Sequence, residues 1–145
     1  MDLIEVWGDG SCKNTGQRNT SMGIGVVVKF NGKLIKEVAE FVGFGTSNIS
    51  EWEALITGLR EAVKFSYTCP NKVKIHYFAD SQLIVNQFNG VYKPTKFLTY
   101  YERAVYWMGC MRSMDMLEVS WIRRELNTHA DHLSKMGNPF TTLKK

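Results

Sequence analysis

The stretch VWGDGSCKN, residues 6–14, joins an apolar segment to a carboxylate and then to a run of small and polar residues. Together with the apolar residues before it, its beginning is typical of a buried strand, which we expect over residues 2–9. A second stretch, VKIHYFAD at residues 73–80, alternates its side chains between two faces and also ends on an aspartate. Two strands that end on Asp9 and Asp80 predict a common site at their ends.

Two further strands are expected between these stretches, over residues 22–30 and 33–42. The dipeptide Asn31-Gly32 separates them and is the strongest short-range signal for a type I′ hairpin. The first three strands of the chain should therefore run antiparallel to one another.

From Ser50 the apolar residues recur at the period of a helix. Ser50 and Glu53 have the spacing of a capping box, which predicts a helix that begins near Glu51. The later patterns predict a short helix, a long helix, a strand and a final helix that Asn127 or Thr128 caps, over residues 81–88, 95–113, 116–122 and 127–136.

The order β-β-β-α-β-α-α-β-α predicts an α/β fold with one mixed sheet of five strands. A right-handed crossover lays the fourth strand parallel to the first, and the fifth is expected to be parallel as well, with helices flanking the sheet. We expect a single domain over residues 1–145, of which about residues 137–145 form an exposed tail.

Composition excludes several classes of protein. The 145 residues contain 18 Lys and Arg against 14 Asp and Glu, a net charge of +4 that is compatible with a polyanionic partner. Cys12, Cys69 and Cys110 are odd in number and far apart, which argues against a disulfide framework or a zinc site. No apolar run approaches the ~18 residues of a membrane span, so we expect no membrane anchor. Reduced thiols fit a cytoplasm best, and we expect a monomer.

Four acids are candidates for one site. If the two aspartate-ended strands are parallel neighbours, Asp9 meets Asp80, with Glu51 on the intervening helix and Asp131 on the last helix. Two carboxylates about 4 Å apart repel by roughly 4 kcal/mol at an effective dielectric near 20, so such a cluster needs protons or a cation. Oxygen ligands suit Mg²⁺ or Mn²⁺, and two such ions can hydrolyse a phosphodiester.

Each residue also has a purely structural interpretation. An aspartate that ends a strand is usually a turn former or a helix cap. Asp9 or Asp80 alone therefore does not indicate a functional site, whereas the two together do. The capping box assigns Glu53 a structural role. His129 and His132 flank Asp131 without an assigned function, and Lys93, Lys96, Arg123 and Arg124 are either substrate contacts or solvated charges.

Four motifs then carry a resemblance along nearly the whole chain. GDGSCKNTG, TSNISEWEALITGL, FADSQLIVNQFNGVY and IRRELNTHADHLS resemble, in this order, the acidic motifs of type 1 ribonuclease H. The likeness is to its compact bacterial and archaeal branch, because the segment before the last strand is too short for the basic protrusion of many relatives. It implies a ribonuclease H-like fold and a metal-dependent endoribonuclease that hydrolyses the RNA strand of RNA–DNA hybrids.

The resemblance also implies roles for individual residues. Asp9, Glu51, Asp80 and Asp131 match the catalytic, metal-binding acids, for two Mg²⁺ ions with Mn²⁺ as a substitute. The positions that match substrate contacts are Gly10, Ser11, Cys12, Asn14, Thr46, Ser47, Asn48 and Gln82, to which we add the basic residues Lys93, Lys96 and Arg124. The small residues after Asp9 fit close approach to the wide minor groove of an A-like hybrid. Whether His129 or Arg124 replaces the family's loop histidine stays open, as does the cutting of double-stranded RNA.

Two alternatives remain at this point. One is a ribonuclease H-like module that binds hybrids without cutting them, and the other is a DNA-specific nuclease of the same fold. The presence of all four acids disfavours the first, and the small residues after Asp9 disfavour the second.

Overall fold

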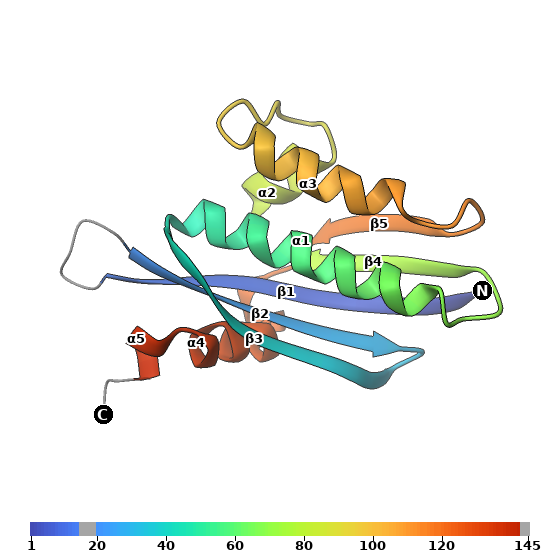
Figure 1. The fold of residues 1–145 in the computed structure, drawn as a ribbon, viewed down its shortest axis with the longest axis horizontal. Coiled ribbons are helices and arrows are strands. Elements are labelled where there is room, and N and C mark those ends of the chain that lie inside the picture. Colours follow the sequence, from blue (N-terminus) through green and yellow to red (C-terminus); the bar gives the residue numbers. More distant parts are fainter. Residues whose placement is uncertain (15–19, 143–145) are drawn as a thin grey trace.

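The computed structural model describes residues 1–14 and 20–142. Within them the strands are β1 (Asp2–Asn14), β2 (Thr20–Phe30), β3 (Lys33–Gly45), β4 (Val73–Ala79) and β5 (Met116–Trp121). They form one sheet in the order β3-β2-β1-β4-β5 (Figure 1). β1, β2 and β3 are antiparallel in succession, β4 is parallel to β1, and β5 is parallel to β4. The predicted five-stranded mixed sheet is confirmed.

Helices cover the two faces of the sheet unequally (Figure 1). One face carries α1 (Ser47–Ser66), α2 (Gln82–Phe88) and α3 (Leu98–Gly109), and the other carries α4 (Thr128–Gly137) and α5 (Pro139–Thr142). The predicted apolar stripe of α1 is buried at every position: Trp52, Leu55, Ile56, Leu59 and Val63. On the opposite face α4 packs on β1, β2 and β3, so the hydrophobic core lies mainly between the sheet and α1.

The pairing of the strands brings the ends of β1 and β4 together. Trp7 is the last residue of β1 that pairs with β4, opposite Phe78. Asp9 and Asp80 each follow two residues later, so the register places them side by side at one edge of the sheet. The hairpin at Asn31-Gly32 is also confirmed, because both residues have the positive φ that a type I′ turn requires.

Strand β1 is longer than the sequence predicted. It continues past Asp9 to Asn14, because each residue from Gly10 onward pairs with β2, up to Asn14 opposite Thr20. The loop expected after Asp9 is therefore a strand, and the carboxylate lies within β1 where its pairing with β4 stops.

The start of α1 was predicted wrongly. The helix begins at Ser47, and Thr46 is its N-cap, with the side-chain oxygen accepting a hydrogen bond from the Ile49 N–H at 3.3 Å. The capping box does not form, because Glu53 makes a two-bond ion pair with Arg103 of α3, both bonds at 3.0 Å. Thr46, one turn before Ser50, caps the helix instead, because threonine is also a favoured N-cap residue.

The C-terminal segment departs from the expected exposed tail. Asn138 is fully buried and exchanges hydrogen bonds with Ser21, since its amide nitrogen donates to the Ser21 carbonyl and its oxygen accepts from the Ser21 hydroxyl. Phe140 of α5 contacts Phe41 and Phe44 of β3. The prediction of exposure from residue 137 onward was therefore wrong at its start, and residues 143–145 lie outside the described part. The predicted long helix is also shorter, since α3 ends at Gly109.

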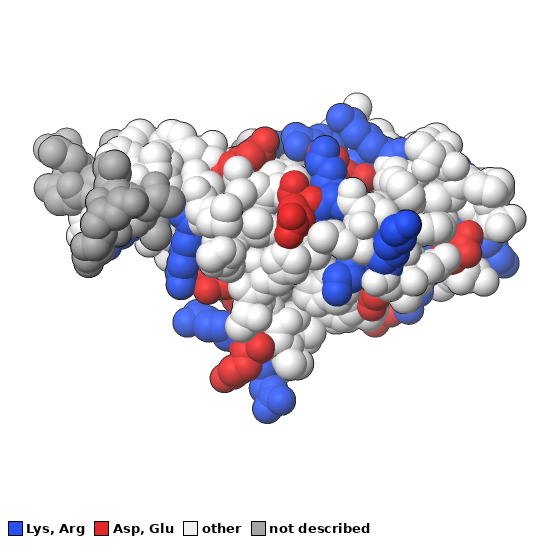
Figure 2. Space-filling model, turned by 90° about the horizontal axis from the view of Figure 1, so that it is seen from below, with Lys and Arg blue, Asp and Glu red and all other residues white. Residues whose placement is uncertain are grey.

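Charges of both signs are mixed on the face that carries α4. Figure 2 shows this face with Lys, Arg, Asp and Glu interspersed and without a large area of one sign. A dispersed distribution of this kind does not form a basic groove on this face. Among the described residues, no helix combines the length and the apolarity needed to cross a membrane.

One close contact links the core to the strand that carries Asp9. A Cβ atom on Gly8 would lie 1.7 Å from the hydroxyl oxygen of Tyr77, which is itself almost fully buried. Gly8 therefore leaves the space that the Tyr77 ring occupies behind β1. A larger residue at position 8 would displace either the strand or the ring.

We expect Gly8→Ala to lower the free energy of unfolding by about 1–3 kcal/mol, the usual cost of overpacking a core. Tyr77→Phe in the same chain should reduce this loss, because it removes the atom nearest to the new methyl group. Urea denaturation measures both. Gly109→Ala is the control, since a Cβ there meets no atom within 4 Å. An equal effect of Gly8→Ala and Gly109→Ala would contradict the packing described.

Candidate active site

Three carboxylates from different elements meet at the edge of the sheet where β1 and β4 stop pairing. Asp9 of β1, Glu51 of α1 and Asp80 after β4 each offer an oxygen, and these oxygens lie within 4.8 Å of one another. Asp131 of α4 lies close enough to Asp9 to raise the pKa of its carboxyl, and the Asp131 side chain also forms an ion pair with Lys135 at 3.1 Å. The four acids proposed from the sequence are thus neighbours, and three of them form the compact acidic cluster Asp9, Glu51 and Asp80.

Gly10 allows α1 to approach β1 at this point. A Cβ on Gly10 would lie 2.4 Å from Ser50 Oγ and 2.7 Å from the Glu51 nitrogen. The Gly10 N–H donates a hydrogen bond to Glu51 Oε1 at 3.2 Å. The absence of a side chain at position 10 therefore lets the backbone hold the Glu51 carboxylate beside Asp9.

The electrostatics of the cluster follow from burial and mutual repulsion. Burial, followed by the negative charges of Glu51 and Asp80, raises the pKa of Asp9 to about 10. Burial likewise raises the pKa of Glu51 to about 8, together with the charge of Asp80 and against a lowering by the nearby Arg124 guanidinium. Without a cation, the cluster therefore retains protons at neutral pH.

Asn127 is a residue of the site that the sequence analysis treated only as a helix cap. Its side chain is almost fully buried, and its amide nitrogen donates to Asp80 Oδ2 at 3.0 Å and to the Gly8 carbonyl at 2.9 Å. It makes no side-chain cap to α4. Asn127 therefore ties the Asp80 carboxylate to β1, and the signal in the sequence was its place in the motif IRRELNTHADHLS, four positions before Asp131.

Several of the residues expected to contact substrate already have protein partners. Ser11 donates a hydrogen bond to the Ser134 carbonyl at 3.0 Å, Cys12 Sγ lies 4.0 Å from Ser50 Oγ, and Thr46 caps α1. Asn14 ends β1, Ser47 and Asn48 open α1, and Gln82 opens α2.

The basic candidates are divided between two places. Lys93 and Lys96 are exposed on the segment between α2 and α3, whereas Arg124 lies in a 3₁₀ turn near Glu51. His129 Nε2 contacts Glu37 Oε2 at 2.5 Å, which directs this histidine toward β3. His132 is exposed on α4.

Comparison with protein families gives one match that covers most of the chain. A family model described as reverse transcriptase-like matches residues 8–137. The bifunctional protein Rv2228c of Mycobacterium tuberculosis is 29% identical over 103 residues, which are 70% of this chain and 26% of that protein. The chain thus spans about a quarter of the length of the curated relatives that it matches.

Solved structures of similar fold include three proteins whose names describe ribonucleases H. LC11-RNase H1, isolated from compost by a metagenomic approach, is 28% identical with a TM-score of 0.81, over 95% of this chain and 96% of that one. The same protein in complex with an RNA/DNA hybrid gives a TM-score of 0.77 over 93% and 96% of the two chains. The N-terminal RNase H domain of Rv2228c shares the fold at 24% identity, with a TM-score of 0.81 over 99% of this chain and 98% of that one. RNase H1 of the archaeon Halobacterium salinarum shares it at 22% identity, with a TM-score of 0.78 over 93% of this chain and 96% of that one.

We expect the stability of the metal-free protein to fall as the pH rises from about 5 to 8. The unfolded chain loses the Asp9 and Glu51 protons near pH 4, whereas the folded chain keeps them, so the folded state binds more protons in this range. Urea denaturation in EDTA at several pH values measures the slope.

Asp9→Asn should flatten this dependence and raise the free energy of unfolding at pH 8 by about 1–3 kcal/mol, because it removes a buried acid without a counter-charge. The exposed Glu125→Gln is the matched control and should change neither value. A slope that Asp9→Asn leaves unchanged would show that the cluster is not protonated.

Asn127→Ala should lower both the stability and the affinity for Mn²⁺, the latter by about 10–100-fold, as expected when a residue that orients a ligand is removed. Calorimetric titration of Mn²⁺ measures the affinity. Asn89→Ala loses a comparable hydrogen bond, at 3.0 Å to the Val119 carbonyl, and should lower only the stability. Equal Mn²⁺ affinities in the two variants would contradict the positioning of Asp80 by Asn127.

Proposed function

The chain belongs to the reverse transcriptase-like family, and from that membership and the acidic cluster we propose that it is a type 1 ribonuclease H. Such an enzyme is a metal-dependent endoribonuclease that hydrolyses the RNA strand of RNA–DNA hybrids. The observation that carries the proposal is the convergence of Asp9, Glu51 and Asp80, whose oxygens lie within 4.8 Å of one another.

The donor set fits divalent cations. All the donors are carboxylate oxygens, which suit hard ions such as Mg²⁺ and Mn²⁺. Burial and mutual repulsion raise the pKa values of Asp9 and Glu51, and bound cations would offset both effects by stabilising the charged carboxylates. When bound, two Mg²⁺ ions supply an activated water and stabilise the departing oxygen of the phosphodiester.

Residues of the chain hold this arrangement in place. We propose that Asp9, Glu51, Asp80 and Asp131 are the metal ligands. The Gly10 N–H fixes Glu51, and the Asn127 amide fixes Asp80, so two of the carboxylates are oriented by groups that are themselves buried or part of the sheet. Such orientation limits the reorganisation needed during the reaction.

Substrate contacts are assigned from the positions that match those of type 1 ribonuclease H. We assign the RNA strand to Gly10, Ser11, Cys12, Asn14 and Gln82. Thr46, Ser47 and Asn48 lie at the start of a 20-residue helix, where free backbone N–H groups favour a phosphate, so we assign them to the neighbouring strands. Lys93, Lys96 and Arg124 supply positive charge, which an enzyme without a basic protrusion needs for binding nucleic acid.

The substrate class and the cellular setting are part of the same proposal. A relative with 28% identity has been solved in complex with an RNA/DNA hybrid, which supports a hybrid as the substrate. The proposal takes the enzyme to be a cytoplasmic monomer with reduced thiols, since the three cysteines are free of disulfides. An RNA duplex is a second substrate to be tested beside the hybrid.

Cleavage of one labelled sequence as an RNA–DNA hybrid, an RNA duplex and a DNA duplex tests the proposal. With Mg²⁺ or Mn²⁺ we expect cuts in the RNA strand of the hybrid, and none in EDTA. Asp9→Asn should lower kcat by about 10³-fold or more, whereas Glu125→Gln should retain it. An intact hybrid with both metals, or DNA cleavage at a comparable rate, would contradict the proposal.

A further inference from the structure

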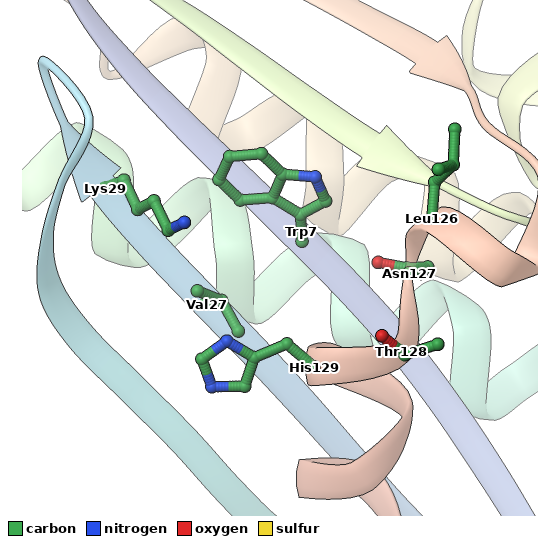
Figure 3. Close-up of a pocket in the computed structure, with 7 residues that line it drawn as sticks. All are labelled: Trp7, Val27, Lys29, Leu126, Asn127, Thr128 and His129. Carbon is green, nitrogen blue, oxygen red and sulfur yellow. The ribbon is translucent and has the colours of Figure 1, made fainter.

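A hollow of about 200 Å³ opens on the α4 face of the sheet, next to the acids. Figure 3 shows Trp7 and Lys29 from the sheet on one side and the start of α4, at Asn127, Thr128 and His129, on the other. Asn127 belongs to both the hollow and the acidic site, because it lines the hollow and also donates a hydrogen bond to Asp80. The proposed hydrolysis does not use the hollow.

The sheet side of the hollow is an aromatic surface with a cation beside it. The Trp7 ring stacks on Phe78 with centroids 5.2 Å apart and an angle of 23° between the planes, which fixes its orientation. The Lys29 ammonium lies 5.2 Å from the centroid of the Trp7 ring. Because this ammonium lies over the ring, a planar ring that stacks there would move it aside, and the displaced ammonium could then meet an attached anion.

The helix side of the hollow favours a negative charge. α4 has ten residues and begins at Thr128, without a side-chain cap from Asn127, so its first N–H groups add a partial positive charge. The acids nearby are already engaged, since Glu37 contacts His129 at 2.5 Å and Asp131 pairs with Lys135 at 3.1 Å. Of the two basic residues that line the hollow, His129 is thus paired and Lys29 can meet an anion, although Glu5 lies opposite Lys29 in the pairing of β1 with β2.

A polar atom without a partner lies at the base of the hollow. Asn127 is 1% exposed, and its side-chain oxygen has no hydrogen-bond partner among the described residues. Figure 3 shows this oxygen turned toward Trp7. A buried carbonyl oxygen of this kind lacks a donor, which a ligand hydroxyl or N–H can supply.

We propose that the hollow binds one nucleoside monophosphate unit. Its base stacks on Trp7, its phosphate lies between Lys29 and the start of α4, and a sugar hydroxyl or base N–H donates toward the Asn127 oxygen. At about 200 Å³ the hollow is smaller than the roughly 300–1,000 Å³ of sites that enclose a ligand of this size, so part of the unit extends beyond it. The unit comes either from a free mononucleotide or from an unpaired end of the RNA strand, and only the second source rests on the proposed function.

Adenosine 5′-monophosphate, adenosine and inorganic phosphate are the probes, and calorimetric titration in EDTA keeps the measurement independent of the metal site and of cleavage. We expect adenosine 5′-monophosphate to bind at least tenfold more tightly than phosphate or adenosine. Lys29→Gln, a surface change that should leave the fold intact, and Trp7→Leu should each weaken binding by about tenfold. Lys33→Gln, on the same hairpin but outside the hollow, should bind as the parent does.

Equal binding of phosphate and the nucleotide, or unchanged binding in Lys29→Gln, would overturn the proposal. The source is decided by the KM for a hybrid with a three-nucleotide RNA overhang against that for a blunt hybrid. A lower KM for the overhang that Lys29→Gln abolishes assigns the site to the substrate strand, and equal KM values assign it to the free nucleotide. If the protein cleaves no hybrid, nucleotide binding in EDTA still tests the hollow by itself.

Discussion

The repulsion among the carboxylates of Asp9, Glu51 and Asp80 is the constraint around which this structure is arranged. Parallel pairing of β1 with β4 forces the two aspartates to one edge of the sheet, and the contact of α1 with Gly10 adds the glutamate. Burial then raises the pKa of Asp9 and of Glu51 well above their ordinary values. An unpaired cluster of this kind destabilises the fold, so its persistence points to a cation as the functional partner.

Gly8, Gly10 and Asn127 hold the backbone segments around the acidic cluster close together. Gly8 and Gly10 have no side chains where Tyr77 and Ser50 approach β1, so the backbone of this strand lies directly against its neighbours. Asn127 then bridges Gly8 and Asp80 from the opposite face of the sheet. The geometry of the acids is therefore set by groups whose own positions depend on packing, which is the arrangement a metal site needs to keep its ligands in place.

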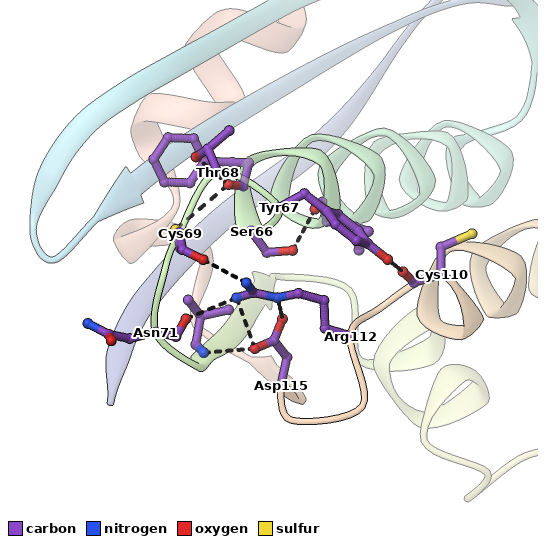
Figure 4. A network of polar contacts seen from close by, with 11 residues as sticks. Ser66, Tyr67, Thr68, Cys69, Asn71, Cys110, Arg112 and Asp115 are labelled. Atoms are coloured by element: carbon purple, nitrogen blue, oxygen red, sulfur yellow. Dashed lines mark hydrogen bonds and ion pairs between the residues drawn. The ribbon is translucent and has the colours of Figure 1, made fainter.

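Periodicity and turn residues were sufficient to predict the sheet, its hairpin and the meeting of Asp9 and Asp80 at one edge, because these depend on local patterns and on the handedness of crossovers. What failed depended on partners distant in the sequence. Glu53 pairs with Arg103 instead of capping its own helix. Asn127 occupies the N-cap position of α4 as predicted, but its side chain binds Asp80 instead of the helix N–H groups. Figure 4 shows another set of contacts between distant residues. Arg112 pairs with the nearby Asp115 and also donates to the carbonyls of Cys69 and Asn71 before β4, and no local pattern predicts these last two bonds.

Calorimetric titration of Mn²⁺ at pH 7, in two buffers with different enthalpies of ionisation, tests the central claim most directly. The difference in heat counts the protons released when the ion binds, because ligands must be deprotonated. With the pKa of Asp9 at about 10 and that of Glu51 at about 8, the cluster should release at least about one proton per ion-loaded chain. Binding without proton release would contradict the account, because the carboxylates would then already be charged in the metal-free protein.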